Sequence, residues 1–235
     1  MKAMILAAGR GQRMRPLTDH TPKPMLLAGG KPLIVWHLER LARAGFREVV
    51  INTAHLGNQI SAALQTGAQW GINIRYSPEH EGALETAGGI ATAQPWNAPE
   101  DPFLLLNGDI FSDWDLAEAW QIAASKRLGL GHLVLVNNPD HHPGGDFGLQ
   151  PDGLVGPLGS TPMSLTFSGQ SILRGTLFHA TRPNHRAALA PLLQSAIREG
   201  QIAGSHHCGH WVDVGTPDRL AALDHTLLRG RPWLP

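Results

Sequence analysis

The residues best suited to chemistry gather in the first 24 positions of the chain. An apolar run at 2–7 leads into a loop whose glycines and cations are Gly9, Arg10, Gly11, Arg13, Arg15 and Lys23. Glycine lets backbone N–H groups approach phosphate oxygens, and cations neutralise the charge of those oxygens. The stretch is therefore typical of a polyphosphate site, with tight turns and solvated arginines as the alternative interpretation.

Two aspartates far along the chain could supply a metal site. Asp109 comes shortly after the apolar run 103–106, and Asp213 alternates with apolar residues in the run 210–214. Carboxylate oxygens are hard ligands of the kind that Mg²⁺ prefers, and aspartates from two separate strands could hold one ion whose other ligands are phosphate oxygens. Taken singly, Asp109 could be a turn residue and Asp213 a surface position of an edge strand.

The elements that must position these residues alternate between strands and helices. We expect strands at 2–7, 48–52, 72–76, 103–106, 133–136, 165–173 and 210–214. We expect helices at 32–44, 57–64, from about 85, at 186–199 and at 217–229. The alternation predicts an α/β fold with a Rossmann-like, mostly parallel mixed sheet between two layers of helices. Ligands of such sheets bind beyond the carboxyl ends of the strands, where the opening loop and Asp109 both lie.

Two common nucleotide motifs do not fit the sequence. A dinucleotide-binding motif needs a third glycine near position 14 and an acidic residue at the end of the second strand, but the chain has Met14 and Asn52-Thr53-Ala54 there. A phosphate-loop NTPase needs Gly-Lys-Ser/Thr after the glycines, and the chain lacks it. The redox-cofactor and phosphate-loop interpretations therefore both fail.

Composition excludes several other classes of function. Lys and Arg number 19, Asp and Glu also 19, and charged residues make up 16% of the chain, so no basic surface for nucleic acid is expected. No apolar run approaches the ~20 residues that span a bilayer, and the amino-terminal run is too short for a secretory signal. The single cysteine, Cys208, cannot form an internal disulfide, which is typical of a reducing compartment. We expect a soluble cytoplasmic protein that binds neither nucleic acid nor membrane.

Several other residues have ordinary explanations. His141-His142 and His206-His207-Cys208 lack a second Cys-x-x-Cys or His-x-x-x-His spacing, so no zinc is expected there. Glu79, Glu81 and Glu85 could form a solvated turn or touch a sugar. Trp36 is expected in a helix core. The tryptophans expected at the surface or at an interface are Trp96, Trp114, Trp120 and Trp233.

Four stretches of the chain resemble the sugar-1-phosphate nucleotidyltransferase family. LAAGRGQRMRPLT with PKPM has the glycines, arginine and lysine that follow the first strand in that family, and ETAGGI, LLLNGDI and HWVDVGTPDRL come after it in the family's order. The resemblance covers essentially the whole chain and implies a fold of the nucleotide-diphospho-sugar transferase type. It also implies a single domain, 1–235, with a nucleotide-binding half at 1–125 and a sugar-phosphate-binding half, including a small sugar lobe, at 126–235.

The same resemblance implies roles for individual residues. The nucleotide-binding residues would be Ala8, Gly9, Gly11, Arg13, Arg15, Lys23 and Gly88. The residues that contact the sugar phosphate would be Asn107, Gly145, Asp146 and Ser168. Asp109 and Asp213 would hold Mg²⁺, and these two aspartates with Arg15 and Lys23 would be the catalytic residues.

The reaction implied by the resemblance is transfer of a uridylyl group from UTP to a sugar 1-phosphate, with pyrophosphate as the second product. NPDHHPGGDF and LTFSG favour N-acetylmuramic acid α-1-phosphate as the sugar, in the recycling of cell-wall sugars. Guanylyl or other nucleotidyl transfer to mannose or glucose 1-phosphate is one alternative. A catalytically silent, nucleotide-sugar-binding regulatory subunit is another. The chain is expected to be a monomer or a small homo-oligomer.

Two expectations concern the chemistry of this reaction. The attacking phosphate is already ionised near neutral pH, so we expect that no histidine acts as a catalytic base. Many larger relatives carry a Glu-Lys-Pro stretch whose lysine grips the sugar phosphate, whereas residues 148–165 here contain no lysine or arginine. The partner of the sugar phosphate must therefore come from elsewhere: from Mg²⁺, from Lys23 or from another residue that the sequence does not identify.

Overall fold

Strand β1 (Lys2–Leu6) lies inside the main sheet of the computed structural model, which describes residues 1–79 and 84–230. It is parallel to β4 (Glu48–Thr53) on one side and to β6 (Pro102–Asn107) on the other, and β4 is parallel to β5 (Asn73–Pro78). Because these strands point the same way, the segments that follow them begin at one edge of the sheet. The opening loop and Asp109 both lie at this edge.

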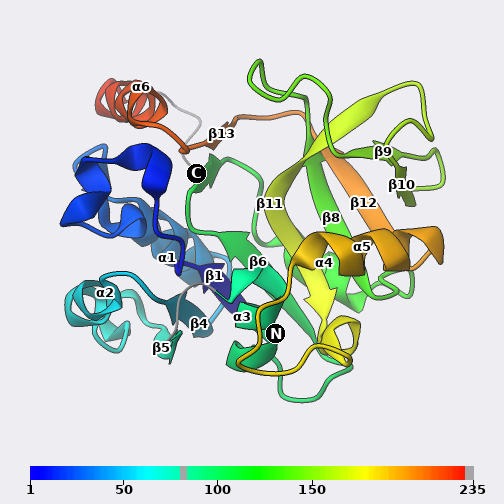
Figure 1. Ribbon diagram of the computed structural model, residues 1–235, viewed down its shortest axis with the longest axis horizontal. Coiled ribbons are helices and arrows are strands. Elements are labelled where there is room, and N and C mark those ends of the chain that lie inside the picture. Colours follow the sequence, from blue (N-terminus) through cyan, green and yellow to red (C-terminus); the bar gives the residue numbers. More distant parts are fainter. Residues whose placement is uncertain (80–83, 231–235) are drawn as a thin grey trace.

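The other half of the sheet is largely antiparallel. β11 (Ser164–Arg174) runs antiparallel to β6 and to β8 (Gly131–Val136), while β12 (Ile202–His207) is parallel to β8. The short strands β9 (Phe147–Leu149) and β10 (Val155–Pro157) continue the sheet from β11. The described residues thus share a nine-stranded mixed sheet (Figure 1).

A bulge in β11 joins the two halves of the sheet. The pairing of β11 with β8 shifts between Phe167 and Gln170, and Gly169 within the bulge has a φ of 78°. A Cβ at position 169 would lie 2.6 Å from Nδ2 of Asn107, the last residue of β6. The bulge therefore brings the antiparallel half against the carboxyl end of a parallel strand.

Helices cover both faces of this sheet. One face carries α1 (Leu33–Arg43), α2 (Gly57–Leu64) and α4 (Glu118–Ala124). The opposite face carries α3 (Glu85–Ala93) and α5 (Leu189–Arg198). This arrangement confirms the predicted three layers. Short 3₁₀ turns lie at Gln12–Met14, Leu17–Asp19, Lys23–Met25, Ala68–Trp70 and Gly175–Phe178.

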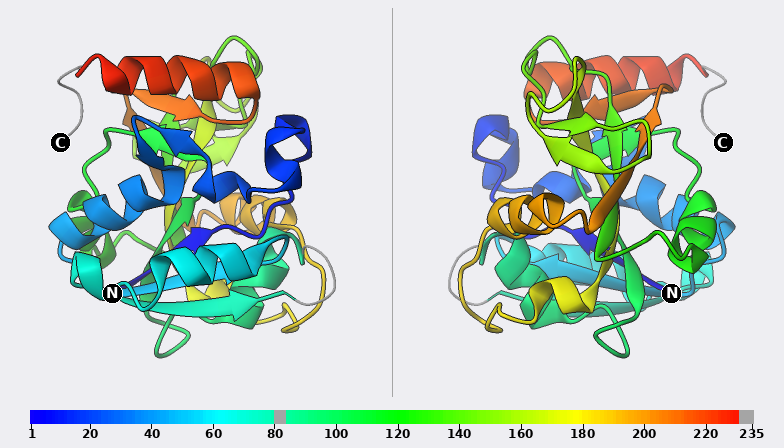
Figure 2. Two further views of the ribbon diagram at one scale, coloured as in Figure 1. Left: turned by 90° about the vertical axis from the view of Figure 1, so that its left-hand side faces the viewer. Right: turned by 90° about the vertical axis from the view of Figure 1, so that its right-hand side faces the viewer.

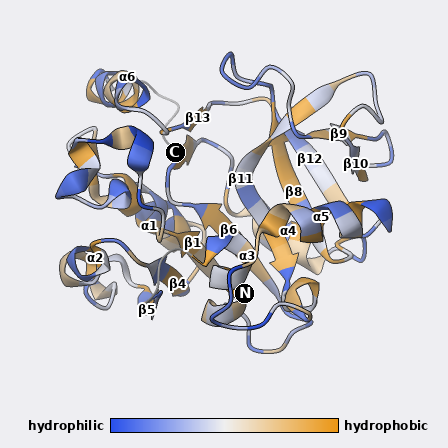
Figure 3. Ribbon diagram, viewed as in Figure 1, coloured by the Kyte–Doolittle hydropathy of each residue, from blue (hydrophilic) through white to orange (hydrophobic). Residues whose placement is uncertain are grey.

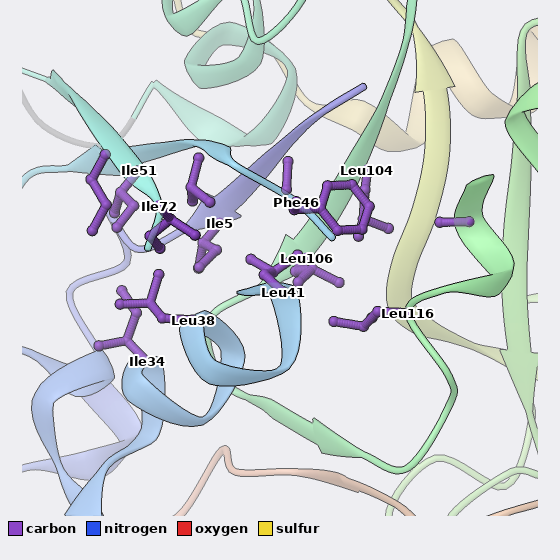
Figure 4. Packing of buried hydrophobic residues seen from close by; sticks show 14 of the residues in the cluster. Ile5, Ile34, Leu38, Leu41, Phe46, Ile51, Ile72, Leu104, Leu106 and Leu116 are labelled. Atoms are coloured by element: carbon purple, nitrogen blue, oxygen red, sulfur yellow. The ribbon is translucent and has the colours of Figure 1, made fainter. Parts of the chain in front are cut away.

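Each face of the sheet buries its own apolar core, because successive residues of a strand point to opposite faces. In β1, Ile5 packs into the core under α1 and Met4 into the core under α3. Figure 4 shows the first core, in which Leu38 and Leu41 of α1 lie beside Leu106 of β6. Figure 3 shows the corresponding pattern along the chain, with apolar strands between helices that carry hydrophilic residues as well.

A third, smaller core joins the two ends of the chain. Helix α6 (Pro217–Leu228) begins after Thr216, whose Oγ1 accepts a hydrogen bond from the N–H of Arg219 at 3.4 Å. Leu223 of α6 belongs to the same buried cluster as Met14 in the opening loop. The segment around α6 therefore lies against the amino-terminal loop (Figure 2).

Two small antiparallel sheets complete the fold. β7 (Ile110–Ser112) pairs with β13 (Trp211–Asp213), and β2 (Leu27–Ala28) pairs with β3 (Lys31–Pro32). Phe111 of β7 packs in the third core. The β7–β13 pair thus links a segment that follows β6 to a segment that precedes α6.

Most of the expected elements are present. The helix predicted at 57–64 is confirmed with those bounds, and the other predicted helices and strands differ from the observed ones by a few residues at their ends. The sequence prediction missed α4, β2, β3, β7, β9, β10 and β12, because they are short or, in β12, mostly polar and glycine-containing. None of the described helices is both long and apolar enough to cross a membrane.

The tryptophans differ from their expected places in one case. Trp114 was expected at the surface, and this is wrong: it is 3% exposed and packs in the first core. Trp36 packs at the edge of the third core, and its indole N–H donates to the carbonyl of Ala28 at 2.9 Å. Trp120 is 36% exposed and stacks on Phe46. Trp233 lies outside the described residues.

Candidate active site

A cavity of about 230 Å³ opens at the carboxyl ends of β1, β4, β5 and β6. It is called the first cavity below. Its lining residues are Leu6, Ala7, Ala8, Gly9, Lys23, Pro24, Asn52, Glu79, Glu85, Thr86, Asn107, Gly108 and Asp109. The parallel strands therefore bring five of the predicted site residues together: Ala8, Gly9, Lys23, Asn107 and Asp109.

A hydrogen-bond network fixes the floor of the first cavity. Asn52 accepts a hydrogen bond from the N–H of Ala7 at 2.9 Å and donates to Oε1 of Glu79 at 2.8 Å. The other oxygen of Glu79 accepts from the N–H of Leu84 at 2.8 Å. Glu79 is 7% exposed, so it is a buried structural carboxylate and not part of a solvated turn. Glu81 lies outside the described residues.

The opening loop folds back on itself at Gly11 and brings Lys23 to the first cavity. Gly11 has a φ of 66°, and a Cβ there would lie 2.9 Å from Cγ2 of Thr18, so the turn requires glycine. Thr18 in turn donates to the carbonyl of Gly11 at 2.8 Å. Arg13 and Arg15 are exposed beyond this turn. Arg15 donates to Asp19 at 2.6 Å, which lowers the pKa of Asp19.

Lys23 is the cation inside the first cavity. It is 8% exposed, and its Nζ donates to Oδ2 of Asp109 at 2.6 Å. The pair spans 86 positions of the sequence, from the opening loop to the end of β6. A buried ammonium ion needs a partner of opposite charge, and Oδ2 of Asp109 is that partner. The other carboxylate oxygen of Asp109 does not bind Lys23.

The β7–β13 pair brings the backbone of Asp213 next to Asp109, although Asp213 is not among the described residues that line the first or the second cavity. Asp213 stands opposite Ile110, the residue after Asp109, and the N–H of Val214 donates to the carbonyl of Asp109 at 2.7 Å. Its Oδ2 accepts from Nη1 of Arg219 at 2.9 Å and lies 3.2 Å from Nε2 of His141. The structure therefore places the two predicted metal ligands at neighbouring positions of one two-stranded ladder.

These two aspartates fit a divalent cation. Oδ1 of Asp213 is buried and has no hydrogen-bond partner among the described residues, which is costly for a carboxylate oxygen unless a cation or water fills the place. No cluster of three or more His, Cys, Asp or Glu side chains suited to a metal occurs in the part of the chain described. The protein would thus supply two carboxylates, and the remaining ligands of the ion would come from phosphate and water.

A second cavity of about 480 Å³ adjoins the first. Its lining residues are Glu85, Thr86, Asn107, Asp146, Phe147, Phe167, Ala188, Leu189, Ala190 and Leu193. Glu85, Thr86 and Asn107 line both cavities and mark the place where they meet. A ligand that reaches from one cavity into the other would pass Asn107.

The remaining residues predicted for the sugar phosphate have different surroundings. Asp146 lines the second cavity, where its carboxylate accepts from the N–H of Phe167 at 2.8 Å and lies 3.0 Å from Nε2 of His142. Ser168 is fully buried, with its Oγ accepting from the N–H of Gln170 at 3.2 Å. Gly145 lies in the loop before Asp146 and is not among the described lining residues of either cavity.

The ETAGG stretch contributes through different residues from the one predicted. Gly88 is buried, and its N–H donates to the carbonyl of Ala187 at 3.0 Å, so this N–H is already paired inside the protein. Glu85 and Thr86, earlier in the same stretch, line both cavities. The structure thus attaches α3 to the segment before α5 through Gly88 and presents Glu85 and Thr86 to the cavities.

Arg186 is a site residue that the sequence did not indicate. It forms an ion pair with Glu85, 101 positions earlier, at 2.7 Å. Glu85 has a φ of 57°, an unusual conformation for a residue with a side chain and one that often marks functional sites. The pair places a cation at the rim where the two cavities meet, although no sequence pattern connects the two residues.

Two buried histidines are neutral and lie outside the cavities. Burial lowers the pKa of His37, which is 2% exposed on α1, to about 3. Burial also lowers the pKa of His132 on β8 to about 4. No histidine is among the described residues that line the first or the second cavity.

Comparison with known proteins assigns this arrangement to a family. Residues 2–150 match the family model described as nucleotidyl transferase. The chain is 53% identical over 221 residues, 94% of this chain and 95% of the other, to the N-acetylmuramate alpha-1-phosphate uridylyltransferase of Neisseria meningitidis. It is 33% identical to the protein of the same name from Caulobacter vibrioides, covering 96% of each chain.

More distant relatives share the fold. The mannose-1-phosphate guanylyltransferase of Mycobacterium tuberculosis is 30% identical over 97% of this chain, which spans 65% of that protein. A crystal structure of a candidate glucose-1-phosphate thymidylyltransferase from Bacillus anthracis superposes with a TM-score of 0.85 at 19% identity, covering 98% of this chain and 96% of the other. The latter likeness shows a shared architecture alone. By its family match and by these full-length relatives, the chain belongs to the nucleotidyl transferase family.

Proposed function

We propose that this protein is a cytoplasmic, Mg²⁺-dependent enzyme that transfers a uridylyl group from UTP to N-acetylmuramic acid α-1-phosphate and releases pyrophosphate. One observation carries the proposal: the first and second cavities meet at Asn107, beside the ion pair of Lys23 and Asp109. A reaction between two phosphates needs two adjoining binding sites with cations at their junction. The proteins of Neisseria meningitidis and Caulobacter vibrioides named above carry this activity in their names.

The first cavity suits the nucleotide. The backbones of Ala8 and Gly9 line it and would face the nucleoside, while exposed Arg13 and Arg15 would reach the triphosphate. Gly11 holds the turn that carries these arginines. Backbone N–H groups and cations in such a loop bind phosphate oxygens at little conformational cost. In this proposal Gly88 supports the base-binding side by its packing.

Lys23 would act at the reacting phosphorus. Lys23 lines the first cavity, and its ammonium group pairs with Asp109, two residues after Asn107, which lines both cavities. It can therefore stabilise the charge that builds on the α-phosphoryl oxygens as the sugar phosphate attacks and pyrophosphate leaves. The oxygen–phosphorus bond to the sugar phosphate forms as the bond between the α- and β-phosphates breaks. The attacking oxygen is already ionised, so the step needs no base. The lack of a histidine among the described lining residues agrees with this expectation.

Enzymes of this family generally use a divalent metal ion, and we assign its ligands here to Asp109 and Asp213. Bound Mg²⁺ would supply charge neutralisation and hold phosphate oxygens in line. Before an ion binds, Lys23 and Arg219 each neutralise one of the two aspartates. These two ion pairs fix the orientation of the carboxylates of Asp109 and Asp213.

The second cavity suits an acidic amino sugar. Its volume of about 480 Å³ exceeds that of the first, and Phe147, Phe167 and Leu189 give it apolar walls. Asn107 and Asp146 offer groups for hydroxyl hydrogen bonds. Muramic acid carries a lactyl carboxylate in addition to its phosphate, and Arg186 at the rim is a cation placed to meet one of these anions.

The test is a matrix of the four nucleoside triphosphates against several sugar 1-phosphates, with pyrophosphate release as the readout. We expect UTP with N-acetylmuramic acid α-1-phosphate to give the highest kcat/KM. Higher kcat/KM with GTP and mannose 1-phosphate would reassign the substrates within the family. UTP binding without pyrophosphate release from any pair would instead favour a regulatory subunit.

A further inference from the structure

The chain leaves the main sheet between β12 and β13 and crosses to the amino-terminal half of the molecule. β12 ends at His207, paired with β8, and β13 begins at Trp211, paired with β7 (Figure 1). The residues between them form a short bridge from the sugar side of the site to the metal-binding side. Asp213 therefore depends on this bridge for its place beside Asp109.

The ladder that carries Asp213 is short. β13 and β7 share three residue pairs, Trp211 with Ser112, Val212 with Phe111 and Asp213 with Ile110. Side chains of a strand alternate between faces, so a slip of one residue would turn the Asp213 side chain to the other face of the ladder, away from Arg219 and His141. Three pairs give few backbone hydrogen bonds to prevent such a slip, and other contacts must fix the register.

A hydrogen bond at the far end of the ladder makes such a contact. Nε2 of His207 donates to Oδ1 of Asp113 at 2.7 Å, and the two side chains are 16% and 21% exposed. The N–H of Asp113 also donates to the carbonyl of His210 at 3.0 Å. Asp113 thus binds the incoming chain twice, directly after β7 ends at Ser112.

The backbone of the bridge passes close to this pair at Gly209. A Cβ at Gly209 would lie 2.6 Å from Cε1 of His207 and would also collide with Oδ1 of Asp113. Glycine at this position lets the bridge pass directly over the hydrogen bond. At the opposite end of the ladder, the N–H of Val214 donates to the carbonyl of Asp109. The ladder is therefore fixed at both ends.

We infer that Asp113 and His207 are positioning residues of the metal site: their hydrogen bond holds β13 in the register that sets Asp213 beside Asp109. The inference rests on the metal ligands assigned in the proposed function. Neither residue is among the described residues lining the two cavities, so their effect reaches the substrates through Asp213. Outer partners that orient a ligand typically change metal affinity by roughly 10- to 100-fold when removed.

The experiment measures Mn²⁺ binding to the full chain by electron paramagnetic resonance, without nucleotide or sugar. We expect Asp113→Ala to weaken Mn²⁺ binding at least roughly tenfold. Asp113→Asn keeps an oxygen that accepts from His207 and should stay within about threefold of the wild-type protein. Glu48→Ala removes the ion pair of Glu48 on β4 with Lys2 on β1, away from the ladder, and should leave Mn²⁺ binding unchanged.

Three outcomes decide the inference. Mn²⁺ affinity in Asp113→Ala equal to that of the wild-type protein would overturn it, even if the melting temperature falls. Equal losses in Asp113→Ala and Asp113→Asn would overturn the role of the hydrogen bond. Asp109→Ala and Asp213→Ala test the underlying assignment: if neither weakens Mn²⁺ binding, the metal site of the proposed function fails first.

Discussion

The first and second cavities share Glu85, Thr86 and Asn107 but are built in different ways. The first is formed by residues that directly follow parallel strands, such as Ala7 after β1. The second is formed by a bulge, a loop and the start of α5, which come from distant parts of the chain. A triphosphate can therefore be bound mainly by local backbone geometry, whereas the acceptor site depends on long-range packing.

The charged groups of the two cavities also differ, in how far they are buried. In the first cavity, the buried ammonium group of Lys23 pairs with Asp109. The buried carboxylate of Glu79 accepts hydrogen bonds from Asn52 and Leu84. At the second, the cation Arg186 is 75% exposed. Buried pairs lose more when one partner is removed, because the other charge remains desolvated. Substitutions should therefore lower activity most among the charged residues of the first cavity and least at the rim of the second.

The largest effect is expected at the two aspartates where the cavities meet. Asp109→Ala and Asp213→Ala should each lower kcat by at least roughly 1,000-fold, since each removes one of two protein carboxylates available to the metal. Pyrophosphate release at saturating UTP and sugar 1-phosphate measures the loss. Wild-type rates in either variant would show that the metal site is wrongly assigned.

Lys23→Met should have the next largest effect, lowering kcat by roughly 100- to 1,000-fold. Methionine keeps the apolar stem but removes the ammonium group, so Asp109 loses its counter-ion as well. Initial rates over a range of both substrates separate kcat from KM. Arg15→Met is the matched comparison, because Arg15 is exposed and held by Asp19. Arg15→Met should raise the KM for UTP and change kcat less than Lys23→Met does. An equal loss of kcat in both variants would contradict the role of the Lys23 ammonium group at the reacting phosphorus.

The sequence predicted the part of the site whose residues are close together in the chain. The opening loop from Gly9 to Lys23 was predicted as a phosphate site, and the structure brings Lys23 into the first cavity. The positions of Asp109 and Asp213 after or within strands were also predicted. The resemblance also implied that both aspartates hold one Mg²⁺, but β7, the strand that pairs with the strand of Asp213, was not predicted, because it has three residues and no clear pattern of its own.

The rest of the site depends on contacts between distant residues. Asn52 served in the sequence only to reject a dinucleotide motif, yet it binds both Ala7 and Glu79. Glu85 and Arg186 are 101 positions apart and meet only because α3 packs on the segment before α5. Such pairs leave no local pattern, so a single sequence cannot reveal them.

Arg186→Gln probes the second cavity and should have a moderate effect. We expect a rise of roughly tenfold in the KM for N-acetylmuramic acid 1-phosphate, about 1.4 kcal/mol, since an exposed charged hydrogen bond is lost. The KM for UTP should change less than about twofold. Arg198→Gln, at the other end of α5, is the control and should change neither constant.

N-acetylglucosamine 1-phosphate, which lacks the lactyl carboxylate, shows which anion Arg186 binds. If its KM is unaffected by Arg186→Gln, the arginine recognises the carboxylate. If both sugars lose equally, the arginine holds the phosphate. No change for either sugar would remove Arg186 from the acceptor site and weaken the contrast drawn between the two cavities.

The last prediction concerns stability and not catalysis, and it compares two histidines that line neither the first nor the second cavity. His37 is neutral when folded, with a pKa of about 3, but takes up a proton below about pH 6.5 when unfolded. The unfolded state therefore binds more protons between these values, and the free energy of unfolding falls on acidification by up to about 1.4 kcal/mol per pH unit from this group. His132, with a pKa of about 4, should lower the free energy of unfolding over a narrower pH range.

Urea unfolding from pH 7 to pH 4.5 should show a flatter pH dependence in His37→Leu than in the wild-type protein. His20 is exposed and provides the control, because His20→Gln should keep the wild-type slope of unfolding free energy against pH. An unchanged slope in His37→Leu would mean that His37 takes up a proton in the folded protein.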